Sequence, residues 1–124
     1  MNPKVFLTIG GTILVTIGFL GIIHVLSTLS SASLFNPPSW INWFHLIFGS
    51  LILIVAFSHS AKWQTVMTLF AVIVGTIGGL AGLIFGPSLA IHFNQPELAD
   101  PSDHIAHLTV GILAFWGWWN RPKK

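Results

Sequence analysis

Residues 66–85 read VMTLFAVIVGTIGGLAGLIF, a stretch that carries no charge. At about 1.5 Å of rise per residue, a helix of this length covers about 30 Å, the thickness of the hydrocarbon core of a membrane. The Gly-Pro pair at positions 86 and 87 is expected to end that helix. The stretch therefore predicts a transmembrane helix.

Three other apolar stretches predict helices of the same kind, at residues 5–26, 40–57 and 103–119. The second and fourth are preceded by proline and by a residue that can cap a helix, and the fourth is followed by Asn-Arg-Pro, which favours a stop. No stretch predicts strands or a separate soluble domain. The sequence therefore predicts an all-α polytopic membrane protein, with four transmembrane helices in a single domain over residues 1–124.

The composition agrees with a membrane protein, because 53% of the residues are hydrophobic and only 6% are charged. So little charge cannot cover a soluble globule of 124 residues. Five basic side chains do not make a surface for nucleic acid, so no nucleic-acid partner is expected. The absence of cysteine excludes disulfides, thiolate metal sites and thiol nucleophiles.

The charged residues are divided between the two sides of the predicted membrane. In a chain that crosses four times, the N-terminus, the middle connection and the C-terminus share one side. All basic residues fall on that side, and all acidic residues fall in or at the end of the third connection. The basic residues are Lys4, Lys62, Arg121, Lys123 and Lys124, and the acidic residues are Glu97, Asp100 and Asp103. The positive-inside rule then predicts cytoplasmic termini, in the inner (plasma) or thylakoid membrane of a bacterium.

One alternative makes the first stretch a signal peptide, because Lys4 precedes it and Ser31-Ala32-Ser33 loosely resembles a cleavage site. Its apolar run is longer than the hydrophobic region of an ordinary signal peptide, which favours a membrane span.

A short internal repeat relates the two halves of the chain. Residues 16–18 (Thr-Ile-Gly) recur at residues 76–78, and the His-x-x-x-Gly element at residues 45–49 recurs at residues 107–111. The two recurrences are separated by nearly the same distance along the chain, as two hairpins of slightly different length would require. We therefore expect two similar helical hairpins, related by an axis along the membrane normal.

The second stretch opens with Asn-x-x-His-x-x-x-Gly at residues 42–49, and the fourth opens with Asp-x-x-x-His-x-x-x-Gly at residues 103–111. Together with the glycine-rich first and third stretches, this pattern resembles the uncharacterised bacterial family of four-helix membrane proteins catalogued as domain of unknown function 4383. The resemblance covers nearly the whole chain. It implies a fold and a topology, and it supplies no activity.

The candidate cofactor-binding residues are His45 and Gly49 in the second helix, with His107 and Gly111 in the fourth. Residues i and i+4 share a helix face, so each glycine opens a notch beside its histidine for a neighbouring helix backbone or for a flat ligand. Asp103 lies four residues before His107 and is expected to accept a hydrogen bond from its ring N–H. Asn42 is the corresponding, weaker partner of His45.

Three interpretations of these histidines remain open. His45 and His107 could hold the iron of a b-type haem or the metal of another tetrapyrrole, with the glycines making room for the ring. A zinc or copper site could draw on the carboxylates and on His24, His45, His92, His104 and His107. The third is structural, with hydrogen bonds that lock the hairpins together. We favour the third and expect neither cofactor nor metal, because motifs this short rarely specify a ligand.

The sequence lacks several features that would indicate transport or catalysis. No charged residue lies in the middle of a span, as ion-coupled transport usually requires, and neither a Gly-x-Ser-x-Gly elbow nor a phosphate-binding loop is present. The Gly-x-x-x-Gly spacings within residues 75–86 predict close helix contact, inside the chain or with a second copy. We therefore expect a non-catalytic accessory or assembly component, whose partners are the lipid bilayer and another membrane protein or a homo-oligomer. A small-solute channel is a weaker alternative.

Overall fold

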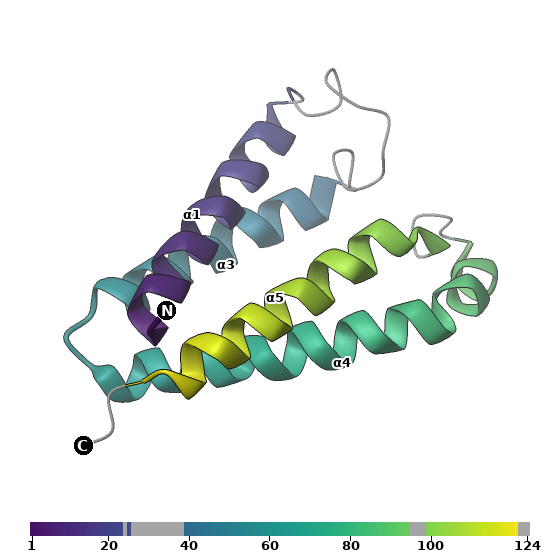
Figure 1. Ribbon diagram of the computed structural model, residues 1–124. Coiled ribbons are helices and arrows are strands. Elements are labelled where there is room, and N and C mark those ends of the chain that lie inside the picture. Colours follow the sequence, from purple (N-terminus) through teal and green to yellow (C-terminus); the bar gives the residue numbers. More distant parts are fainter. Residues whose placement is uncertain (24, 26–38, 95–98, 122–124) are drawn as a thin grey trace.

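The computed structural model describes residues 1–23, 25, 39–94 and 99–121, and these residues form four helices (Figure 1). In chain order the helices are α1 (Pro3–Ile22), α3 (Ser39–Phe57), α4 (Ala61–Phe93) and α5 (Pro101–Trp119). The prediction of an all-α fold is confirmed over the described residues. Three of these helices, α1, α3 and α4, are long and apolar enough to cross a membrane, whereas α5 falls short in hydropathy.

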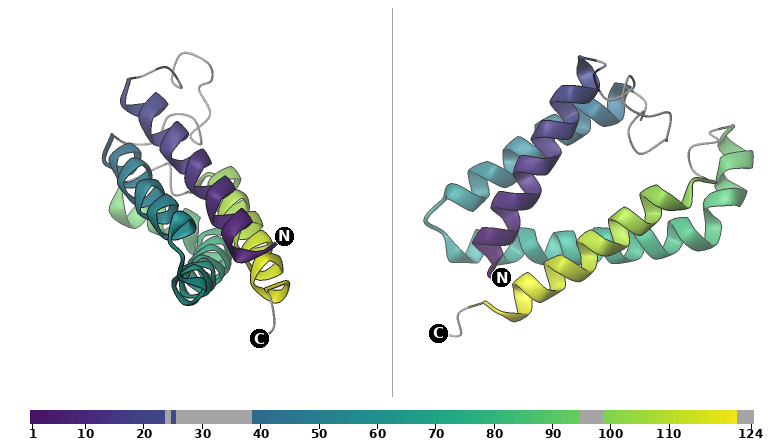
Figure 2. Two further views of the ribbon diagram at one scale, coloured as in Figure 1. Left: turned by 90° about the vertical axis from the view of Figure 1, so that its left-hand side faces the viewer. Right: turned by 45° about the horizontal axis from the view of Figure 1, so that its top comes forward.

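The helices pack as two antiparallel pairs, α1 with α3 and α4 with α5. The pairs meet where α1 contacts α4 and α5 and where α3 contacts α4. They then diverge toward the far end of the molecule, as Figure 1 and the right-hand view of Figure 2 show. Each pair is therefore packed along its length, while the two pairs share a shorter interface.

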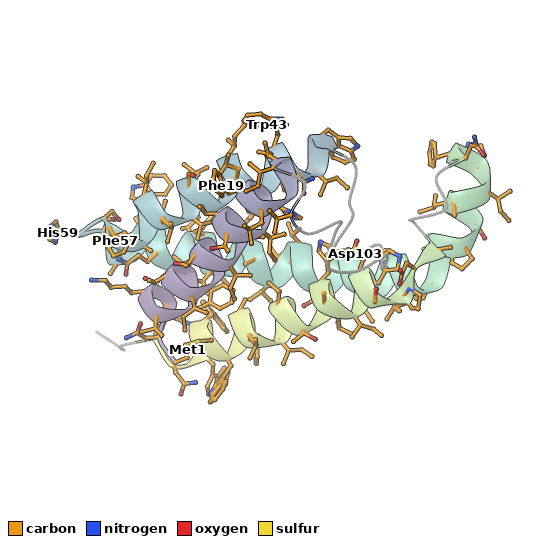
Figure 3. All side chains as sticks on the ribbon, turned by 90° about the horizontal axis from the view of Figure 1, so that it is seen from above. Met1, Phe19, Trp43, Phe57, His59 and Asp103 are labelled. Atoms are coloured by element: carbon orange, nitrogen blue, oxygen red, sulfur yellow. The ribbon has the colours of Figure 1, made fainter. Side chains whose placement is uncertain are left out.

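The start of α1, the end of α5 and the α3–α4 turn lie at the same end of the molecule (Figure 1). We call this the basic end, because Lys4, Lys62 and Arg121 belong to it. Asp103 lies at the start of α5, away from Met1 and His59 of the basic end (Figure 3). We call the opposite end of the helices, with Asp100 and Asp103, the acidic end. The separation of charge that the sequence predicts is therefore present among the described residues.

The shared interface of the two pairs is an apolar core nearer the basic end. Its buried members are Phe6, Leu7, Ile52, Ala56 and Ala114. Much of the remaining surface is apolar and exposed, and Ile54, Ile77 and Ile84 each expose well over half of their area. A membrane protein presents such a surface to lipid, so the burial pattern agrees with an embedded bundle.

α1 begins close to the predicted position and ends earlier than predicted. The side chain of Asn2 caps it by accepting a hydrogen bond from the Val5 N–H at 3.0 Å, and Pro3 occupies the first turn. α1 ends at Ile22, whereas the apolar run predicts a helix to residue 26. His24 and residue 26 lie outside the described residues.

The predicted boundaries of the third helix, residues 66–85, are wrong at both ends, because α4 spans 33 residues. It begins at Ala61, where the Ser60 hydroxyl accepts a hydrogen bond from the Trp63 N–H at 3.4 Å. It runs through Gly86-Pro87 and ends before Asn94, which adopts a left-handed conformation (φ 51°). At about 1.5 Å per residue α4 is about 50 Å long, which exceeds the hydrocarbon core of a membrane.

The helix continues past Pro87 because a proline removes a single backbone hydrogen bond and bends a helix without having to end it. Gly86, just before it, has no Cβ to clash with the proline ring, so the helical conformation there costs less. The last turns of α4 do bend away from the rest of the helix, as Figure 3 shows. The sequence rule that proline stops a helix fails here for this reason.

Candidate functional site

The two predicted notches, at Gly49 and Gly111, are both filled by backbone of the neighbouring helix. A Cβ at Gly49 would lie 2.8 Å from the Val15 backbone nitrogen on α1. A Cβ at Gly111 would lie 2.6 Å from the Thr76 backbone nitrogen on α4. Real Cβ atoms do not approach other atoms so closely, so the glycines let two helix backbones touch. Each notch could receive a neighbouring helix backbone or a flat ligand, and in this fold it receives the helix backbone.

Close contacts continue along the line where α1 and α3 pack against each other, which we call the α1–α3 seam; the corresponding line between α4 and α5 is the α4–α5 seam. A Cβ at Gly18 would lie 2.5 Å from the Leu46 backbone nitrogen and 2.7 Å from the Asn42 carbonyl oxygen. Toward the acidic end, Gly21 faces the Asn42 side chain, and a Cβ there would overlap its amide. Small residues on α1 thus receive both the backbone and one polar side chain of α3.

The seam between α4 and α5 repeats this arrangement. A Cβ at Gly79 would lie 2.7 Å from the Leu108 backbone nitrogen and 2.8 Å from the His104 carbonyl oxygen. A Cβ at Gly82 would overlap the His104 ring. Gly79 therefore corresponds to Gly18, Gly82 to Gly21, and His104 to Asn42.

This correspondence sets the register between the two halves of the chain. The sequence match of residues 16–18 with residues 76–78 pairs Gly18 with Gly78, whereas the contacts pair Gly18 with Gly79. The match is therefore out of register by one position. Gly78 has no described atom within 4 Å of where its Cβ would be. The match of residues 45–49 with residues 107–111 agrees with the contacts.

The side chain of His107 lies outside the seam and is 47% exposed. Its ring Nδ1 is 2.8 Å from the backbone carbonyl oxygen of Asp103 and 3.8 Å from the Asp103 carboxylate. A carbonyl oxygen only accepts, so Nδ1 carries a proton, and the neutral tautomer of the ring has its lone pair on Nε2. The predicted partner is thus the right residue, but its backbone, and not its carboxylate, fixes the tautomer.

His45 is half-buried on α3, and its Nδ1 has no hydrogen-bond partner among the described residues. Asp103 and His107 lie close enough to act electrostatically on its ring, so the structure brings the two predicted histidines to the same region. Asn42, the predicted partner of His45, lies against Gly21 instead. The Asn42 side-chain oxygen is also buried without a hydrogen bond from any described residue.

The other histidines are dispersed. His92 is exposed at the end of α4, where its ring meets Phe93 edge to face, and His104 fills the space beside Gly82. His24 and Glu97, both candidates for the zinc or copper site, lie outside the described residues. Within the described part of the chain, no three histidines or carboxylates are placed to hold a metal ion together.

From the sequence, His104 and Asn42 are named only singly, and their equivalent polar positions in the two seams are not predicted. Each lies seven residues before a seam glycine, Gly111 or Gly49, so the spacing puts them on the same helix face two turns away. The sequence does contain this signal. It is hidden because His45 and His107 form a more conspicuous motif with the same glycines.

Comparisons with protein-family models, with curated proteins and with solved structures found no match to this chain. The family resemblance of the sequence therefore stays a prediction. The features of the chain that bear on its function are the seams and the polar residues outside them.

Proposed function

We propose that this chain is a four-span membrane protein, built as two similar hairpins, that acts as a non-catalytic accessory or assembly component. The repeated seam contacts support the two similar hairpins. α5 is the fourth span in this proposal: its 19 residues cover about 28 Å, and its glycine face packs on α4. The basic end is cytoplasmic, because every described Lys and Arg belongs to it.

The observation that carries the functional proposal is the group of polar side chains outside the seams, formed by His45, Asp103 and His107. His107 and Asp103 each expose 47% of their side chains, and His45 has an unpaired ring nitrogen among the described residues. In or near lipid, polar atoms without water are costly and seek partners on other helices. A second membrane protein, or another copy of this chain, would supply those partners.

The group lies on the parts of α3 and α5 nearer the acidic end, where the helix pairs diverge (Figure 2). A partner helix entering there would contact both pairs at once. Such a position, with access to both pairs, suits recognition of another protein, and we therefore favour recognition over catalysis.

Site-specific photo-crosslinking in cells tests this function. A photoreactive amino acid at Val110, an exposed position three residues after His107, should form an adduct with one defined protein. The same amino acid at Ile54, exposed on α3 nearer the basic end, is the matched control and should label lipid only. Equal protein adducts at both positions, or none at Val110, would contradict the proposal.

One observation favours a second candidate function, the binding of a b-type haem or another tetrapyrrole. His45 Nδ1 is unpaired among the described residues, and the His107 tautomer leaves Nε2 free to coordinate. The ring would have to lie between the helix pairs, because Gly49 and Gly111 are already filled. An absorbance spectrum of the purified protein before and after dithionite decides between the two, since a stoichiometric Soret band that shifts on reduction supports haem.

A further inference from the structure

A shallow apolar hollow of about 250 Å³ lies between α3 and α4, toward the basic end. Phe48 of α3 forms one wall, and Trp63, Val66, Met67 and Phe70 of α4 form the other. The Phe48 and Phe70 rings are tilted against each other with centroids 6.0 Å apart. The lining suits a hydrocarbon chain and offers almost nothing to a polar ligand.

The α4 wall of the hollow lies on the same stripe of the helix surface as a positively charged side chain. Lys62, Val66 and Phe70 are spaced at i, i+4 and i+8 on α4, so they share one stripe of the helix surface. Side chains on a helix lean toward its N-terminus, which for α4 is the basic end. The stripe therefore runs over about 12 Å, from an ammonium group near the basic end to the half-exposed Phe70 ring at the hollow.

The charge around this edge is of one sign. Lys4 and Arg121 lie at the same end, and the described acidic residues, Asp100 and Asp103, are at the opposite end. Trp63, which lines the hollow and follows Lys62 in the chain, is near the start of α4, where indole rings favour the headgroup layer. An occupant that is apolar along one end and negatively charged at the other fits both features.

We propose that this hollow binds one anionic phospholipid, with an acyl chain against Phe48, Met67 and Phe70 and the headgroup phosphate at Lys62. The inference rests on the proposed membrane topology, which places the basic end at the cytoplasmic headgroups. The hollow holds the chain, and the cation selects a negatively charged lipid over a zwitterionic one. A lipid held in this way would tie α3 to α4 beside the turn that joins them.

Native mass spectrometry of the full chain, released from vesicles that contain equal amounts of phosphatidylglycerol and phosphatidylcholine, tests the proposal. We expect one retained lipid, with phosphatidylglycerol preferred by about fivefold, which corresponds to about 1 kcal/mol for one cation near a membrane surface. Lys62→Gln should lower that preference to about one. Lys4→Gln, a matched loss of charge at the same end but off the stripe, should leave it unchanged.

A second variant separates the contribution of the hollow to lipid binding from that of the Lys62 charge. Val66→Trp fills the hollow while keeping Lys62, so it should reduce retention of both lipids together. Equal retention of the two lipids by the parent, or an unchanged preference in Lys62→Gln, would overturn the anionic site. Failure of the parent to float with the vesicles would instead overturn the proposed membrane topology, so the two failures are distinguishable.

Discussion

Gly82 of α4 and His104 of α5 are in direct contact, and a methyl group at Gly82 would overlap the imidazole ring. The same relationship joins Gly21 of α1 to the amide of Asn42 on α3. In each helix pair, one polar side chain therefore packs against a glycine, beyond the point where the two backbones touch. The free energy of unfolding should therefore respond to a methyl group added at a seam glycine.

Gly79→Ala should destabilise the protein, and Gly78→Ala should not, although the two glycines are adjacent. A Cβ at Gly79 would lie 2.7 Å from the Leu108 backbone nitrogen, so the helices must separate, at a cost of about 1–3 kcal/mol. A Cβ at Gly78 meets no described atom within 4 Å, and alanine there should stabilise the helix by up to about 1 kcal/mol. Unfolding in detergent with increasing denaturant measures both. Equal effects of the two substitutions would place the seam on the wrong face of α4.

A corresponding contrast is expected in α1, where Gly18 occupies the seam and no described atom lies within 4 Å of a Cβ at Gly10. Gly18→Ala should lower the free energy of unfolding by about 1–3 kcal/mol, because the methyl group meets α3 backbone at Leu46. Gly10→Ala should be neutral or stabilising. If Gly18→Ala were harmless while Gly79→Ala was damaging, the two hairpins would not be equivalent.

Gly82→Ala should cost less in a His104→Ala background than in the parent, because the truncated side chain leaves space for the new methyl group. A double-mutant cycle should give a coupling of about 1 kcal/mol between the two positions. His107→Ala is the control, since the His107 side chain is half-exposed and hydrogen-bonds to the Asp103 backbone in its own helix. Additive effects of Gly82→Ala with His104→Ala would mean that the two residues do not meet in the folded protein.

The four helices and the separation of basic and acidic residues to opposite ends can be predicted from the sequence, because they depend on the length of the apolar stretches, on charge and on turn residues. The face that each helix presents to its neighbour is harder to predict. In α4 both the lipid-facing and the seam-facing positions are apolar, so hydrophobic periodicity does not distinguish them. Small size is the remaining signal, and the adjacent glycines at 78 and 79 leave it ambiguous by one residue, or about 100° of helix rotation. The one-residue error in the repeat arises there.

The boundaries of α4 and the position of His104 in the α4–α5 seam also escaped prediction for physical reasons. Lys62 and Trp63 look like loop residues in a hydropathy pattern, yet Ser60 caps the helix before them. His45 and His107 stand four residues before glycines, which suggested a shared face. The neighbouring helix backbone fills the notches beside them, and His104 takes the polar position in the α4–α5 seam.

The central claim is that all four helices cross the membrane with both termini in the cytoplasm, and accessibility of single cysteines tests it directly. The chain has no native cysteine, so Ser60→Cys, Ala99→Cys and Asn120→Cys each give one reactive site. In intact cells an impermeant maleimide should label Ala99→Cys and leave Ser60→Cys and Asn120→Cys unlabelled until the membrane is opened. Labelling of Asn120→Cys together with Ala99→Cys would show that α5 does not cross, and labelling of Ser60→Cys in place of Ala99→Cys would show that the orientation is reversed.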